Sequence, residues 1–481
     1  MLSVIVFVPL LGALAIVLQN AKSERAIKWT ALIFAAIPLI LTVYLITQFD
    51  PKAGVQFVDK VSWSKTIGAS YYLGVDGISL PMVFLTALLG VIAVGASWNI
   101  KLEVKGYFAL LLILLTGILG VFVALDYILF YIFWEQVLLP MYFLIGIWGG
   151  KKREYAAIKF FLFTLTGSVL MLVAILAVYF EGGANTFDIL ALADRGLPVG
   201  FQHLVFWGFF AGFAVKVPIF PFHSWLPDAH VEAPTAISVL LAGVLLKMGT
   251  YGFLRVIVTT TPDALASYSW ILATLAVINI FYGALNAMIQ KDLKRLIAYS
   301  SISHMGYVML GIASFSALGL NGAVLMMFSH GLITAMLFLL VGYLYERTHT
   351  RNIPELGGLL NIIPLLAGFL CFASFASLGM PGLSGFAAEF MVLIGAFAKA
   401  PAWALVASGG VVITAGYMLW MLQRVVMGLL PEKWEKLKDL TPREMATLVP
   451  LVSFIVIVGI YPESILYFIN NSVVALTKAL G

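Results

Sequence analysis

The hydrophobic positions of this chain form long apolar runs that are separated by short polar stretches. Most runs are close to the roughly 20 residues that an α-helix needs to cross the hydrocarbon core of a bilayer. The pattern therefore predicts fourteen membrane-spanning helices, which cover residues 2–19, 27–48, 78–97, 107–125, 127–148, 156–180, 203–222, 235–258, 268–289, 294–314, 320–345, 361–399, 403–428 and 446–471. The stretches 54–72 and 182–201 are expected to be the longer external loops.

Two of the predicted helices contain signals that interrupt a helix. The seventh runs into a segment with four prolines, namely Pro218, Pro221, Pro227 and Pro234, and proline removes a backbone donor. The twelfth run is too long for one span at about 1.5 Å per residue, and a Gly-Met-Pro-Gly sequence that includes Pro381 lies in its middle. Broken backbone at membrane depth is tolerated only against protein or a water-filled cavity, so both breaks indicate internal sites.

The order of the helices predicts an internal duplication. Helices four to eight (residues 107–258) and helices nine to thirteen (259–430) each have a broken helix as their fourth member. Because five is odd, the second copy must cross the bilayer in the opposite direction to the first. The predicted fold is an all-α polytopic membrane protein with two inverted five-helix repeats, flanked by residues 1–106 and 431–481. Paired broken helices in inverted halves indicate a transport site near the midplane.

Composition and charge agree with this class and add an orientation. The chain is 62% hydrophobic and 11% charged, and its net charge of +5 comes from lysines and arginines in the loops. Loops that follow odd-numbered helices hold Lys22, Arg25, Lys28, Lys101, Lys105, Lys151, Lys152, Arg153, Lys291, Lys294, Arg295, Arg347, Arg351, Lys433, Lys436, Lys438 and Arg443. Loops that follow even-numbered helices hold mainly Lys52, Lys60, Lys65, Arg195 and Lys399. The positive-inside rule makes the first group cytoplasmic, so both termini are expected on the outer side.

Several kinds of chemistry are not expected within this chain. Its one cysteine, Cys371, excludes an intrachain disulfide and cysteine-ligated iron–sulfur or four-cysteine zinc sites. Neither a H-E-x-x-H metal motif nor a phosphate-binding glycine loop after a strand is present. We therefore expect no metal or cofactor site of its own and no nucleic-acid partner.

Six ionisable residues lie inside the predicted spans: Glu135, Lys216, Lys247, His304, His330 and Glu389. Inserting a lysine at the middle of the bilayer costs at least about 3 kcal/mol of free energy, so buried ionisable residues of this kind indicate a functional role. Burial and neighbouring charges move pKa values toward neutrality, which suits groups that pass protons. A Glu135–Lys216 pair would hold both groups charged, and separating the pair would let Lys216 release its proton.

A structural interpretation stays open for each of these residues. A single buried acid or base can be half of a structural ion pair, and a single histidine can be a packed core residue. Six such groups in one chain favour a proton relay over a purely structural role. A second polar group lies between the prolines and is interpreted as structural support that caps helix ends; it comprises His223, Asp228, His230 and Glu232.

Five motifs resemble, in order, the antiporter-like membrane subunits of respiratory complex I. They are LGVDGISL, FPFHSWLPDAHVEAPTAISVLLAGVLLKMG, KDLKRLIAYSSISHMGY, FSHGLITAMLFLLVG and GMPGLSGFAAEF. Within that family, FYIFWEQVLLPMYFLIGIWGG and the acidic residue Glu389 are similar to the chain M type of bacterial NADH–quinone oxidoreductase. The resemblance covers nearly the whole chain.

The resemblance implies a proton channel in the bacterial inner membrane with no redox centre of its own. By motif, Glu135 and Lys216 would be the coupling pair, and Lys247 the central carrier, fed from the cytoplasm. His304 and His330 would connect Lys247 to Glu389, which would release the proton outside. NADH, FMN, iron–sulfur clusters and quinone are expected in partner subunits, and quinone reduction there would supply the energy. The expected partners are other membrane subunits of the complex, including neighbouring antiporter-like subunits, and the lipid bilayer.

Other functions share part of this pattern. An Mrp-type cation/proton antiporter subunit carries most of the same motifs, and a membrane hydrogenase subunit is a further relative. Carboxylates and water can serve sodium as well as protons. A haem-binding electron carrier with His304 and His330 as axial ligands is the alternative from a different class.

Overall fold

The structure is a computed structural model that describes residues 1–183 and 185–479. Within these residues, eleven helical spans are long and apolar enough to cross a membrane. Three shorter apolar helices, among them α1 (Leu2–Leu18), accompany them. The predicted all-α polytopic class is confirmed.

The N-terminal part consists of three helices and a β-hairpin. The helices are α1, α2 (Glu24–Gln48) and α3 (Ser79–Ala96), and the hairpin pairs β1 (Gln56–Ser64) with β2 (Ala69–Val75) in antiparallel register. The hairpin occupies what the sequence predicted as an external loop. Asp59 of β1 accepts hydrogen bonds from the backbone and hydroxyl of Ser3 and pairs with the N-terminal ammonium, so it fixes the start of α1.

The first five-helix set follows in the predicted order. Its elements are α4 (Val104–Val123), α5 (Tyr127–Gln136), α6 (Leu138–Trp148), α7 (Arg153–Gly182), α8 (Ile189–Arg195), α9 (Val199–Lys216), α10 (Trp225–Glu232), α11 (Thr235–Leu240), α12 (Leu246–Gly252) and α13 (Val258–Thr260). Helices α5 and α6 form one span, and α11 to α13 form another. The fourth member is broken between α9 and α10, as predicted.

The second set repeats this order. Its elements are α14 (Pro262–Met288), α15 (Leu293–Ala313), α16 (Ala317–Thr348), α17 (Pro364–Ser377), α18 (Ser384–Phe397) and α19 (Pro401–Val425). Short 3-10 turns lie at Ile353–Glu355, Leu359–Asn361 and Glu432–Trp434. Its fourth member is broken between α17 and α18, again as predicted. The residue boundaries of the two repeats stay a prediction.

The chain ends in two helices where the sequence predicted one. Helix α20 (Pro442–Ile460) stops just before Pro462, and α21 (Glu463–Ala479) follows. Helix α21 packs against α16, where the amide of Asn321 donates to Asn470 at 2.8 Å.

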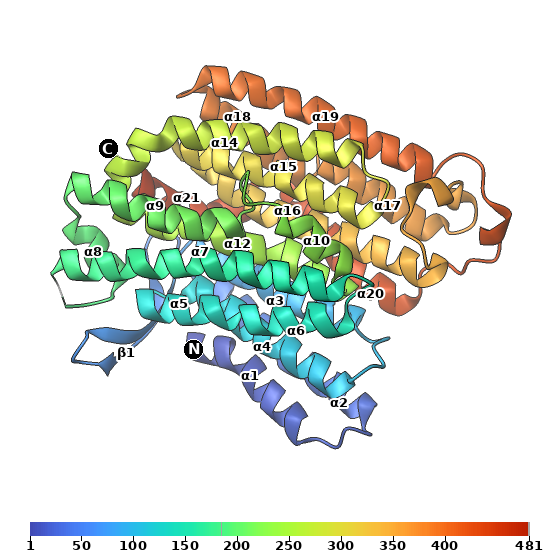
Figure 1. The fold of residues 1–481 in the computed structure, drawn as a ribbon, viewed down its shortest axis with the longest axis horizontal. Helices are drawn as coiled ribbons and strands as arrows, with labels where there is room; N and C mark the ends of the chain where they lie inside the picture. Colours follow the sequence, from blue (N-terminus) through green and yellow to red (C-terminus); the bar gives the residue numbers. More distant parts are fainter. Residues whose placement is uncertain (184, 480–481) are drawn as a thin grey trace.

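The helices lie side by side, with the first set on one flank and the second on the other (Figure 1). The hairpin lies at one end of the bundle, and the loops between α6 and α7, α14 and α15, and α16 and α17 lie at the other. We call the latter the basic end, because these loops carry the lysines and arginines that the charge pattern grouped together. The most apolar 18-residue stretches of the spans 235–260 and 317–348 are completely buried, as expected for helices that are apolar on all sides.

Candidate functional site

A buried asparagine holds the first break in shape. Helix α9 ends at Lys216, and the chain is irregular until α10. The side chain of Asn279, on α14, accepts from the amide of Phe220 at 2.8 Å and donates to the carbonyl of Pro218 at 3.1 Å. Asn279 thus satisfies two backbone groups that the broken helix cannot pair. It was not among the predicted residues, although an asparagine inside an apolar run was a readable signal.

Lys216 lies in the last turn of α9, only 1% exposed. Its ammonium lies 5.5 Å from the ring centre of Trp134 and 5.6 Å from that of Phe160. Ring faces and the C-terminal end of a helix both favour a cation. Glu135 is the acidic group that acts on Lys216, yet neither Lys216 Nζ nor Glu135 Oε1 has a hydrogen-bond partner among the described residues. The predicted coupling pair therefore makes no direct hydrogen bond through these two atoms in this structure.

Lys247 lies between two π-helical segments, Leu241–Leu245 and Phe253–Ile257. It is fully buried, and its ammonium donates to the carbonyl of Ala242 in the first segment. The same nitrogen lies 2.7 Å from Nδ1 of His330. π-helical turns are frequent at functional sites because they alter which backbone groups are paired.

The two predicted histidines and Glu389 continue from Lys247 as a chain of buried groups. The rings of His330 (α16) and His304 (α15) have centres 5.4 Å apart. His304 Nε2 lies 3.5 Å from Oε1 of Glu389 and 3.0 Å from the carbonyl of Ser377. A cavity of about 10 Å³ lies between the two histidines and Glu389, close to the size that one water needs. The structure thus brings four of the six predicted residues together.

The second break shapes the surroundings of Glu389. Gly379 has a φ of +80°, and a β-carbon there would lie 2.8 Å from Oε2 of Glu389. Only glycine adopts this backbone conformation at low cost. The carboxylate of Glu389 therefore folds back over the break, which lies between α17 and α18.

The acidic residues of the predicted supporting group tie neighbouring helices together. Asp228 of α10 pairs with Lys159 at 2.7 Å and with Arg295 at 3.0 Å. The carboxylate of Glu232 accepts from the backbone amide of Lys152 at 2.9 Å. These contacts join α10 to α7, to α15 and to the loop before α7.

The histidines of that group are packed against aromatic rings. His223 lies with its ring centre 4.7 Å from that of Tyr282, and His230 lies 4.5 Å from Phe338. His230 is fully buried. In the described residues, neither imidazole ring makes a hydrogen bond that caps a helix end, which is the role that the sequence had suggested.

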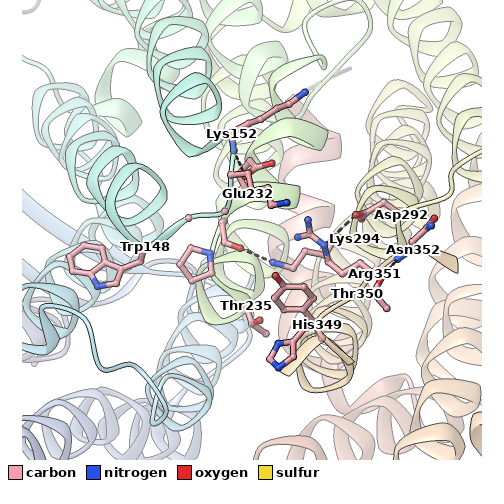
Figure 2. Close-up of a pocket in the computed structure, with 16 residues that line it drawn as sticks. Trp148, Lys152, Glu232, Thr235, Asp292, Lys294, His349, Thr350, Arg351 and Asn352 are labelled. Atoms are coloured by element: carbon pink, nitrogen blue, oxygen red, sulfur yellow. Dashed lines mark hydrogen bonds and ion pairs between the residues drawn. The ribbon is translucent and has the colours of Figure 1, made fainter. Parts of the chain in front are cut away.

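A polar cavity of about 740 Å³ opens at the basic end between the two sets of helices (Figure 2). Acidic and basic side chains line it together, and Arg351 pairs with Asp292 at 3.2 Å. Glu232 and Lys294 also face it, and Lys294 is only 4% exposed. Thr235, the first residue of the span that carries Lys247, also lines the cavity.

A buried ion pair that the sequence did not predict lies beyond Lys247. Arg255 follows Lys247 by about two helical turns, and its guanidinium pairs with the carboxylate of Asp76. Asp76 also accepts from the amides of Ile78 and Ser79 at the start of α3. This pair fixes the hairpin end of the span 235–260.

The geometry limits which ligands this site accepts. No cluster of three or more histidine, cysteine, aspartate or glutamate side chains arranged to hold a metal ion is found in residues 1–183 and 185–479. The cavity between His304 and His330 is far too small for a porphyrin, and His330 Nδ1 already contacts Lys247. The haem alternative is therefore not supported.

Comparisons with known proteins agree with this architecture. Residues 124–414 match the family described as NADH:quinone oxidoreductase/Mrp antiporter, transmembrane. NADH-quinone oxidoreductase subunit M of Rhodobacter capsulatus is 44% identical over 99% of this chain and 96% of its own. NAD(P)H-quinone oxidoreductase chain 4 1 of Synechococcus elongatus is 44% identical over 95% of this chain and 88% of its own.

Among solved structures, a chain of respiratory complex I from Thermus thermophilus superposes with a TM-score of 0.93. It is 30% identical, and the match covers 100% of both chains. The enclosed lysine–histidine–glutamate chain, the paired broken helices and these matches lead to one assignment: this chain belongs to the antiporter-like membrane subunits of respiratory complex I, of the subunit M type.

Proposed function

We propose that this chain translocates protons as a membrane subunit of a bacterial NADH–quinone oxidoreductase. The observation that carries the proposal is the contact between Lys247 and His330 at 2.7 Å, inside two spans whose most apolar stretches are completely buried. His304 and Glu389 continue the chain at distances that one proton transfer, or one water, can bridge.

Each group in this relay can take up a proton and release it. Lys247 gives a proton to Nδ1 of His330, whose other nitrogen, Nε2, has no partner among the described residues. An imidazole that accepts at one nitrogen can release from the other, so the proton passes on toward His304. Glu389 then accepts it at its carboxylate, beside the second break.

Glu135 and Lys216 are proposed to set the direction of transfer. Closing the pair would keep both groups charged, and the Glu135 carboxylate would offset the charge of Lys216. Opening the pair, as in this structure, removes that counter-charge and lets Lys216 release its proton. Quinone reduction in partner subunits is proposed to drive the change.

The remaining assignments follow from the family. We propose the bacterial inner membrane as the location, with the basic end cytoplasmic and both termini outside, as the positive-inside rule requires. Other membrane subunits, including neighbouring antiporter-like subunits, are the proposed partners. NADH, FMN, iron–sulfur clusters and quinone would be held by those partners.

The test compares Lys247→Ala, Lys247→Arg and wild type in inverted membrane vesicles with matched amounts of assembled complex. Proton uptake and quinone-dependent NADH oxidation are recorded together. Both variants should lose pumping, because alanine carries no proton and arginine does not release one. Lys399→Ala, at an exposed position, is the control. Normal pumping in Lys247→Ala at normal turnover would refute the relay, and absence of NADH–quinone activity in wild type would favour cation/proton antiport.

A further inference from the structure

Lys216 is a buried cation that no hydrogen bond holds in this structure. It is 1% exposed, and its Nζ has no hydrogen-bond partner in the described part of the chain. Glu135 acts on it as a charge but makes no hydrogen bond with it. Taking an ammonium out of water is costly, so the surroundings must supply an attraction of another kind.

Two aromatic ring faces supply that attraction. The ammonium of Lys216 lies 5.5 Å from the ring centre of Trp134 and 5.6 Å from that of Phe160. Both distances are within the roughly 6 Å over which the negative face of a ring attracts a cation. Trp134 is 1% exposed and Phe160 is 0% exposed, so water does not screen the attraction. We call these two rings the aromatic seat of Lys216.

Neighbouring rings hold the aromatic seat beside the end of α9. Trp134, on α5, packs against Phe213, which lies about one turn before the last residue of α9, with ring centres 5.6 Å apart. Phe160, on α7, meets Trp225 in a T-shaped arrangement with ring centres 5.4 Å apart. The indole nitrogen of Trp225 donates in turn to the carbonyl of Val215 at 2.9 Å. Both rings of the seat are therefore anchored to the residues that lead into the first break.

We propose that Trp134 and Phe160 are positioning residues that hold Lys216 when it is away from Glu135. The ammonium then has two positions, one on the carboxylate and one on the ring faces, and the second lowers the cost of separating the pair. Trp134 directly precedes Glu135 on α5, so the same turn of helix offers both positions. The rings exchange no proton themselves. Because a ring face attracts a cation less strongly than a carboxylate does, Lys216 can still release its own proton. This inference rests on the proposed function, in which the pair opens and closes.

The competing interpretation is that the two rings only fill space around the break. Trp134 and Phe160 are among the largest fully buried side chains of the described residues, so both interpretations predict that they matter for packing. The two interpretations differ in the property of the ring that is needed. Packing depends on the size and shape of the ring, whereas the aromatic seat depends on the negative charge of its face.

The first test compares Phe160→Leu with Phe206→Leu in the assembled complex, with proton uptake and NADH oxidation measured in inverted vesicles. Phe206 is the matched control, because it is also 0% exposed and lies on α9, but its ring packs against Phe210 and Tyr268 rather than against the ammonium of Lys216. Pumping should fall about 5- to 30-fold in Phe160→Leu, which corresponds to about 1–2 kcal/mol lost from the open pair. Pumping should stay close to wild type in Phe206→Leu. Equal losses in the two variants would overturn the aromatic seat.

The second test keeps the ring and weakens only its face, so it does not depend on Phe160→Leu assembling. Phenylalanine analogues that carry one, two or three fluorine atoms are incorporated at position 160, because each fluorine draws electron density from the ring face with little change in size. The aromatic seat predicts that pumping falls with each added fluorine at position 160 and stays constant in the same series at position 206. Constant pumping at position 160, with Lys247→Ala inactive, would overturn the aromatic seat and leave the proposed function standing. Normal pumping by Lys247→Ala would instead overturn the proposed function.

Discussion

Replacing Asn279 by leucine should loosen the first broken helix while leaving the fold in place. Asn279 is 0% exposed, and its amide satisfies the Phe220 N–H and the Pro218 carbonyl. Leucine has a similar branched shape but offers neither bond, so two buried backbone groups lose their partners. At about 1–2 kcal/mol for each group, the segment between α9 and α10 should lose roughly 2–4 kcal/mol of local stability.

Hydrogen exchange measures this loss at the site. A decrease of roughly 2–4 kcal/mol in the opening free energy corresponds to about 30- to 700-fold faster exchange of the Phe220 amide. Asn286→Leu is the matched control on the same helix, because Asn286 donates only to the carbonyl of Tyr282 in its own helix. Peptides that cover residues 217–224 should therefore change in Asn279→Leu and not in Asn286→Leu. Equal exchange in the two variants would refute the assignment of Asn279 as the support of the break.

Three further predictions concern other contacts. Gly379→Ala should reduce proton pumping while the complex still assembles, because an alanine at a φ of +80° costs about 1–2 kcal/mol of stability and its methyl group would displace the Glu389 carboxylate. Gly368→Ala is the control: there is open space around Gly368, so this variant should pump normally in the same assay. Arg255→Met should destabilise the purified protein by about 3–5 kcal/mol, because it leaves the Asp76 carboxylate buried without its partner, and thermal denaturation should show partial recovery in the double variant with Asp76→Asn. Partial burial alone would raise the pKa of Asp59, but hydrogen bonds from Ser3 and the N-terminal ammonium outweigh it and lower that pKa. The contact between Asp59 and the start of α1 should therefore be complete above the ordinary value of 3.8 and be lost as the pH falls below it. Its loss should appear as increased hydroxyl-radical labelling of residues 1–5 in acid.

The sequence predicted the helices and both breaks well, because these depend on local features. Apolar length determines a span, and proline or glycine interrupts it, so the breaks after Lys216 and at Gly379 could be read directly. The split between α20 and α21 had the same kind of signal in Pro462, but the surrounding apolar run concealed it. The hairpin was missed because two short strands in a polar loop carry little of the alternation that marks a buried sheet.

The residues of the candidate site could be proposed from the sequence, but the distances between them could not. Ionisable residues within apolar runs identify themselves, so the lysines, histidines and glutamates were named in advance. The lack of a hydrogen bond between Glu135 and Lys216, the π-helical turns around Lys247 and the support from Asn279 depend on how distant helices pack. The pairing of Arg255 with Asp76 joins residues 179 positions apart, which no local pattern specifies.

The direct contact between Lys247 and His330 has a consequence for ion selectivity on the proposed route. At 2.7 Å between the two nitrogens, a proton can pass along the hydrogen bond, but no metal ion fits between them. A sodium ion would also need several oxygen ligands, and nitrogen atoms line this step. The cavity ahead of Glu389, at about 10 Å³, would admit a single water and not a hydrated cation. The step between Lys247 and His330 therefore selects protons over sodium ions. A proton can be exchanged between the two fixed side chains, whereas a sodium ion would have to move through the space between them.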